Sequence, residues 1–146
     1  MSKSYQGIWR YQLPEAYHFQ SPHLQGIEFA NHWVTIMDAE MVVSKLYAWD
    51  GCSPTYYVPV FGWVGTPDGK RDEKGIPQSY HASLVHDVLC QFRREIPVTK
   101  HVSVTLFKEL LLQGGFHPQA ASLYAWFVKL WGPQDFLGDE LISRNA

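Results

Sequence analysis

The chain has 146 residues and a formal net charge of −2, with 46% hydrophobic and 18% charged residues. This length fits a single domain, residues 1–146, that buries about two thirds of its unfolded surface without disulfide or metal support. The sequence lacks the basic stripe of a nucleic-acid-binding protein, so we expect no nucleic-acid partner. It also lacks an apolar run long enough to cross a membrane and a signal-peptide pattern, so we expect no membrane span and a cytoplasmic location.

Aromatic residues make up 15% of the chain and include six tryptophans. Core packing explains most tryptophans, but such an excess is also typical of surfaces that bind proteins or ligands. The cysteines, Cys52 and Cys90, lie far apart and lack the C-x-x-C spacing of a metal or redox pair. We therefore expect two reduced, unlinked thiols.

The first half of the chain predicts a small, mainly antiparallel sheet. Alternation of apolar and polar residues is the pattern of half-buried strands. The expected strands lie at residues 5–13, 23–30, 32–38 and 40–49. The last two form a hairpin across a turn at Asp38 and Ala39.

Residues 49–77 predict a long loop. Prolines at 54, 59, 67 and 77 prevent a long helix, and Asp68-Gly69 is typical of a tight turn. Loops of this length inside compact domains are usually functional or mobile.

Three helices are expected after the loop, at residues 78–95, 102–113 and 118–131. Each has apolar residues at helical spacing, and Gly114 and Gly132 end the second and third. The tail from residue 134 is expected to be extended or a short turn. The sequence therefore predicts an α+β fold in which the N-terminal sheet packs against three C-terminal helices.

The helix at 78–95 is predicted to be the most buried, with Val85 and Leu89 on its main apolar stripe and Ala82, His86 and Cys90 on a second flank. Asp87 is the only formal charge between residues 78 and 92. A carboxylate on a mostly buried helix needs hydrogen-bond partners. Asp87 is therefore the first candidate functional residue.

The proposed site consists of Asp50, Ser53, His86 and Asp87. His86 and Asp87 are adjacent, so their side chains diverge by about 100° on a helix and must reach different partners. In one arrangement His86 faces the loop at Asp50 while Asp87 anchors the other helices. In another, Asp50 and His86 bind a divalent metal, which would be the cofactor. In a third, the group is only a structural polar network that ties the loop to the helix.

Residues 46 to 132 resemble a family of phages, prophages and bacteria known as domain of unknown function 1353. The resemblance consists of a D-G-x-S-x-P-like element at 50–54, a loop to Pro77, A-x-x-x-H-D ending at His86-Asp87, and matching positions at Phe107, Gly114, Ala121, Tyr124 and Gly132. The chain departs from the family at Val104, where members often carry Asp. The resemblance implies a phage or prophage origin and no particular activity.

Two classes of function follow. The first is a small hydrolase in which Asp50, Ser53, His86 and Asp87 form the catalytic site, with His86 as metal ligand or general base. The second is a non-enzymatic phage accessory, virion-associated or host-interaction protein whose exposed aromatic residues bind a phage or host protein. The corresponding locations are the host cytoplasm and the virion.

Overall fold

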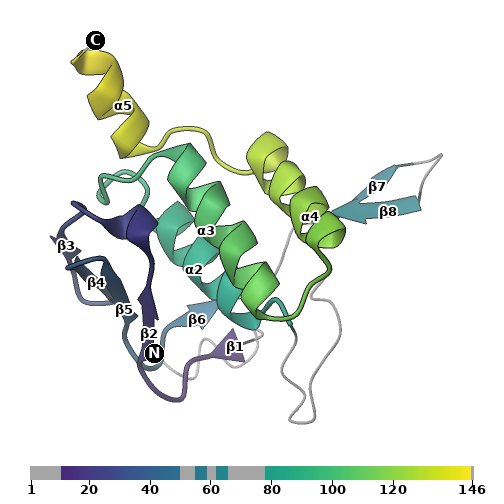
Figure 1. Cartoon of the computed structure of the whole chain (residues 1–146), viewed down its shortest axis with the longest axis horizontal. Coiled ribbons are helices and arrows are strands. Elements are labelled where there is room, and N and C mark those ends of the chain that lie inside the picture. The colour runs from purple at the N-terminus through teal and green to yellow at the C-terminus, as the bar shows by residue number, and fades with distance from the viewer. Residues whose placement is uncertain (1–10, 50–54, 59–61, 66–77, 146) are drawn as a thin grey trace.

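The computed structural model describes residues 11–49, 55–58, 62–65 and 78–145. Figure 1 shows the N-terminal strands as a layer beside a group of neighbouring helices, with the last helix of the chain extending from one end. The α+β prediction is therefore confirmed. The strands are β1(Tyr11–Gln12), β2(Tyr17–Gln20), β3(Phe29–Ala30), β4(Val34–Met37), β5(Glu40–Val43), β6(Ala48–Trp49), β7(Thr55–Val58) and β8(Gly62–Gly65).

The main sheet is antiparallel and has the strand order β2-β5-β4-β3. The predicted hairpin is confirmed, because β4 and β5 pair across Asp38 and Ala39, which adopt φ values of 53° and 63°. Positive φ at both central residues fits the right-handed twist of the paired strands. The predicted strand at 40–49 is wrong as a single element, since a turn at Lys45–Leu46 separates β5 from β6.

Three other expectations about strands need correction. β2 lies in a segment that alternates too weakly to be recognised, and most of the predicted strand at 23–30 is the end of a 3-10 helix (Pro22–Leu24) and a turn before β3. The expected long loop at 49–77 contains the antiparallel hairpin of β7 and β8. Its prolines exclude a helix but still permit short strands between them.

The helices are α2(Tyr80–Gln91), α3(Lys100–Gln113), α4(Pro118–Trp131) and α5(Leu137–Arg144). The first three match the predicted segments. Thr99 begins α3 by accepting a hydrogen bond from the Val102 amide, and Pro118 occupies the first turn of α4. The prediction of a helix-free tail is wrong, because α5 spans eight residues there.

The core lies between the strand layer and α2, and continues between α2, α3 and α4 (Figure 1). Of the helices, α2 has the most buried residues, and Val85 and Leu89 are both 0% exposed, as predicted. Burial of such aliphatic side chains contributes about 1.5–3 kcal/mol each. Position along α2 therefore decides whether a polar side chain faces the strands or the other helices.

Candidate functional site

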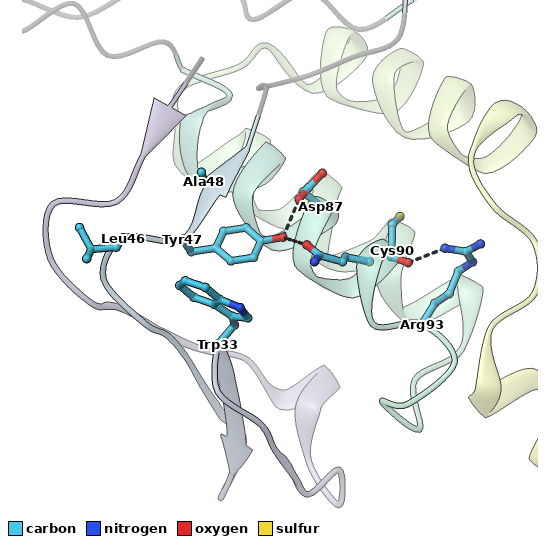
Figure 2. A pocket seen from close by; sticks show the side chains of 8 residues that line it. Trp33, Leu46, Tyr47, Ala48, Asp87, Cys90 and Arg93 are labelled. Carbon is cyan, nitrogen blue, oxygen red and sulfur yellow. Dashed lines mark hydrogen bonds between the residues drawn. The ribbon is translucent and has the colours of Figure 1, made fainter. Parts of the chain in front are cut away.

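A pocket of about 380 Å³ lies between the strand layer and α2. Figure 2 shows the Tyr47 ring reaching from the strand side toward Asp87 on α2, with Trp33 beside it. The lining residues are Trp33, Leu46, Tyr47, Ala48, Asp87, Cys90, Gln91 and Arg93. One side of the pocket is aromatic and aliphatic, whereas the α2 side is polar.

Tyr47 is the centre of the polar side. Its hydroxyl oxygen lies 2.6 Å from Asp87 Oδ2 and 2.6 Å from the side-chain oxygen of Gln91, Oε1. A phenol has a single proton, so Tyr47 donates to the Asp87 carboxylate. Gln91 Oε1 is the second acceptor beside the same hydroxyl, so the carboxylate and the amide oxygen share one donor. Asp87 thus obtains the partner that its position on a buried helix requires.

This arrangement keeps Tyr47 protonated. The side chain is 3% exposed, and burial together with the Asp87 charge raises the pKa of its phenol far above the ordinary value. An un-ionised phenol donates a hydrogen bond but is not a base at neutral pH. The network is therefore suited to holding the strand layer on α2.

His86 faces away from this pocket, toward α3. Its ring lies 5.1 Å from the Phe107 ring, centroid to centroid, and its Nε2 lies 3.5 Å from Cys90 Sγ, one turn along α2. The predicted divergence of His86 and Asp87 is confirmed by these contacts. The first arrangement considered directs Asp87 to the other helices, whereas in the structure Asp87 accepts a hydrogen bond from Tyr47 on the strand side.

The protonation states of His86 and Cys90 follow from burial. Burial, with a smaller contribution from the nearby Lys100 ammonium, lowers the pKa of His86 to about 4. Burial raises the pKa of the Cys90 thiol to about 12, which the Lys100 charge opposes only in part. At neutral pH the pair is a neutral imidazole and a thiol, and a protonated thiol is a poor nucleophile.

An aromatic cluster supports the pocket from the side of β1 and β6. Trp49 is 0% exposed, contacts Tyr47 and Tyr80, and donates from Nε1 to Ser83 Oγ at 2.9 Å. Ser83 in turn donates to the Tyr80 carbonyl. Every polar atom named here is satisfied, so the cluster fixes α2 against the strands.

Of the four predicted site residues, the structure places two. Asp87 lines the pocket and His86 lies on a different flank of α2. Asp50 and Ser53 lie outside the described residues, so the expected convergence of Asp50 with His86, and the metal site formed by them, stay predictions. Within the described ranges, no three His, Cys, Asp or Glu side chains are grouped so that they could hold a metal ion.

Sequence reasoning missed Tyr47 and Gln91 as the partners of Asp87. Gln91 lies four residues after Asp87, which places both on one flank of a helix, and this spacing was a usable signal. Tyr47 gave no such signal, since its contact spans forty positions. The alignment of His86 with Cys90 was visible in the sequence and is confirmed.

No protein-family model, curated protein or solved structure matches this chain significantly. None of the described helices is both long and apolar enough to cross a membrane. Function is therefore inferred from the chemistry of the pockets and surfaces of the chain.

Proposed function

We propose that this protein is a non-enzymatic binding protein that docks a helical segment of a partner protein on the outer face of α4. We define the α4 face by residues Leu123, Trp126, Phe127, Leu130 and Trp131. In keeping with the resemblance to the phage and prophage family, we place the protein in the accessory or host-interaction class, acting in the host cytoplasm or on the virion.

The observation that supports this proposal is the exposure of the α4 face. Leu123 and Trp126 are each 51% exposed, Leu130 is 47% exposed and Trp131 is 46% exposed. Large exposed apolar patches on soluble proteins usually mark interaction sites. Tryptophan is also among the residues most enriched at the energetic centres of interfaces.

The α4 face is ordered by its own contacts. The rings of Phe127 and Trp131 stack with their centroids 4.8 Å apart, and Trp126 contacts both at 5.4 and 5.9 Å. Rings held in place lose little conformational entropy when a partner binds. The positions 123, 126, 127, 130 and 131 form a stripe along one side of the helix, the shape that a second helix packs against.

The opposite side of α4 is buried against the rest of the protein. Ala121, Ala125 and Val128 are buried, and they face the rest of the helical layer. Lys129 is the only charged residue of α4, so the outer face has an unusually low charge for a surface helix. α4 is therefore apolar on two sides, of which one is buried and the other is largely exposed.

The network at Tyr47 favours a structural role for Asp87 over the hydrolase hypothesis. Asp87 accepts a hydrogen bond from Tyr47, Cys90 is a protonated thiol, and His86 lies on another flank of α2. Asp87 is therefore engaged by Tyr47 and Cys90 is not ionised at neutral pH, so neither is prepared to attack a substrate bond. Binding is the function that these observations support better.

The test uses the double variant Leu123→Gln/Leu130→Gln, which changes two exposed side chains without removing a ring contact. The matched control is Met37→Gln/Ile142→Gln, because these side chains are 55% and 63% exposed on other elements. A displayed library of random linear peptides is selected on the purified wild-type chain. Enriched peptides are synthesised with a fluorophore, and their dissociation constants are measured by anisotropy.

We expect enriched peptides with apolar residues at helical spacing. They should bind the control like the wild type and the α4 variant at least about tenfold more weakly, which corresponds to about 1.4 kcal/mol. Equal binding to all three proteins, or no enrichment over the empty matrix, would overturn the proposal. A dimer in sedimentation velocity that the α4 variant abolishes would also overturn it, because the face would then serve self-association.

A further inference from the structure

A second pocket, of about 660 Å³, lies along α3 where α3 meets α4 and the start of α5. We call it the basic pocket. Figure 1 shows α3 and α4 side by side, with the chain returning from α4 to α5 near the beginning of α3. The pocket is lined by Lys100, His101, Val104, Thr105, Lys108, Lys129 and Asp139. Three ammonium groups and one carboxylate give it a positive character.

Lys100 and Asp139 already make hydrogen bonds within the protein. Lys100 Nζ donates to the carbonyl oxygens of Val128 and Pro133, at 3.0 and 2.6 Å, and so holds the end of α4. Asp139 Oδ2 accepts the backbone amide of Lys100 at 2.8 Å. Asp139, the one carboxylate among the described residues that line the pocket, is therefore committed to the first turn of α3, where it favourably meets the helix dipole.

Lys108 and Lys129 have no such role. Among the described residues, Arg93 pairs with Asp135, and both Arg94 and Arg144 pair with Glu140. No carboxylate in that part of the chain lies within 4.0 Å of the ammonium group of Lys108 or Lys129. Two cations on facing helices that have no carboxylate partner among the described residues form a site for an anionic group.

The basic pocket adjoins the α4 face. Lys129 lies three residues after Trp126 on α4, so the two side chains are neighbours on the helix surface. On the α3 side, Val104 and Thr105 give the pocket wall apolar character between the lysines. A ligand that reaches both surfaces must combine apolar side chains with negative charge.

This combination identifies the ligand as a protein segment. An amphipathic helix presents apolar residues on one side and carboxylates at the flank of that side. A nucleic acid would have little to bury against Leu123 and Leu130, and the net charge of −2 opposes a polyphosphate backbone. A second copy is disfavoured too, since antiparallel pairing of two α4 helices brings the same lysine-bearing flanks together.

We propose that the basic pocket, through Lys108 and Lys129, binds carboxylate side chains of the same partner segment whose apolar side docks on the α4 face. This inference rests on the proposed function and specifies the partner as an acidic amphipathic helix. The apolar contacts supply most of the affinity, and the lysines select acidic over neutral partners and set the dependence on ionic strength.

The test compares two synthetic peptides of fourteen residues with identical Leu and Trp positions at helical spacing. One peptide has Glu at the flanking positions and the other has Gln. Their dissociation constants are measured at low ionic strength for the wild type, for the single variant Lys129→Gln and for the double variant Lys108→Gln/Lys129→Gln. Lys45→Gln is the control for Lys129→Gln, since Lys45 is exposed in the turn between β5 and β6.

We expect the wild type and Lys45→Gln to bind the Glu peptide about tenfold more tightly than the Gln peptide, with Lys129→Gln intermediate. In Lys108→Gln/Lys129→Gln the preference should disappear while the affinity for the Gln peptide is unchanged. The variant Leu123→Gln/Leu130→Gln should weaken the binding of both peptides by the same factor and keep the preference for the Glu peptide.

The two levels of the proposal fail differently. If the wild type binds both peptides equally and Leu123→Gln/Leu130→Gln binds neither, the inference of an acidic partner is overturned. Docking of a helix on the α4 face is then still supported. Affinities that no α4 substitution changes overturn the proposed function itself. Displacement of the Glu peptide by inorganic phosphate or a thymidine decanucleotide at lower concentrations than by hexaglutamate assigns the pocket to phosphates and overturns the inference.

Discussion

The hydroxyl of Tyr47 lies 2.6 Å from Asp87 Oδ2 and joins the strand layer to the middle of α2. Tyr47 immediately precedes β6 and is buried, so its hydrogen bond is shielded from water. Hydrogen bonds to charged groups in such surroundings contribute about 1.5–3 kcal/mol. Together with the hydrogen bond from Trp49 to Ser83, this phenol connects the strand side to α2 through polar contacts.

The variant Tyr47→Phe should lower the free energy of unfolding by about 1.5–3 kcal/mol, because it leaves the Asp87 carboxylate and the Gln91 amide without their shared partner. Urea unfolding followed by circular dichroism measures this change. Tyr17→Phe is the control, since the Tyr17 ring stacks on His81 and its hydroxyl has no hydrogen-bond partner in the described chain. A cost for Tyr47→Phe within 0.5 kcal/mol of the control, the size typical of surface substitutions, would contradict the structural role.

His86 makes stability depend on pH in a defined window. Its folded pKa of about 4 lies below the ordinary value of 6.5, so between these pH values the unfolded chain binds more protons than the folded chain. Stability is therefore fully present above about pH 6.5 and falls as the pH decreases toward 4. At pH 4 the loss from this residue amounts to about 3 kcal/mol.

The variant His86→Gln should remove that part of the acid destabilisation, leaving a smaller slope to which His81 contributes, because burial lowers its pKa as well. Free energies of unfolding measured at intervals from pH 7 to pH 4 test this expectation. His23→Gln, at an exposed position, controls for the effect of the substitution itself. If His86→Gln retains the full wild-type slope, His86 is not the group responsible.

Cys90 should react slowly with thiol reagents in the folded protein. Its thiol pKa of about 12 leaves only a minute fraction of thiolate at neutral pH. In a Cys52→Ser background, alkylation by iodoacetamide at pH 7.5 should be at least about 100-fold slower than for an exposed thiol of ordinary pKa. Unfolding in urea should restore the ordinary rate. Fast alkylation of the folded protein would instead favour a nucleophilic role for Cys90.

The sequence predicted the helical half of the fold well, because helices are specified by local periodicity. The apolar spacing of residues 78–95 and the glycines at 114 and 132 lie within a few positions of the effects they produce. The strand layer was predicted less well. The strands that were not predicted are β2, β7 and β8, and each is defined by its pairing with another strand rather than by a strong alternating pattern of its own.

The contacts of the candidate site also differ in whether local sequence spacing predicts them. The contact between His86 and Cys90 is one helical turn long and follows from spacing. The contact between Tyr47 and Asp87 joins positions from two layers, and no local pattern encodes it. The exposure of the α4 face has the same origin, since apolar residues surround much of α4 and only the packed structure reveals which side is covered.

The sequence pattern did not predict α5, because the attachment of this helix to the start of α3 depends on a close backbone contact. Gly138 is buried, and its amide donates to the Val98 carbonyl oxygen at 3.0 Å. A Cβ atom at this position would lie 2.6 Å from Val98 O and 2.7 Å from Thr99 N. Both atoms belong to the backbone that begins α3, so neither can rotate away. Only glycine allows α5 to dock here.

Gly138→Ala should therefore lower the free energy of unfolding by at least about 2 kcal/mol, within the range for overpacked sites, and release α5 from the start of α3. The control is Gly26→Ala, whose cost of about 1 kcal/mol should come only from its positive φ of 82°, since its Cβ would meet no atom within 4 Å. Hydrogen exchange distinguishes the two, because only Gly138→Ala should deprotect the amides of Leu137 and Gly138, which bond to Arg93 and Val98. If both variants cost the same and α5 stays protected, the packing of Gly138 against Val98 does not hold the helix in place.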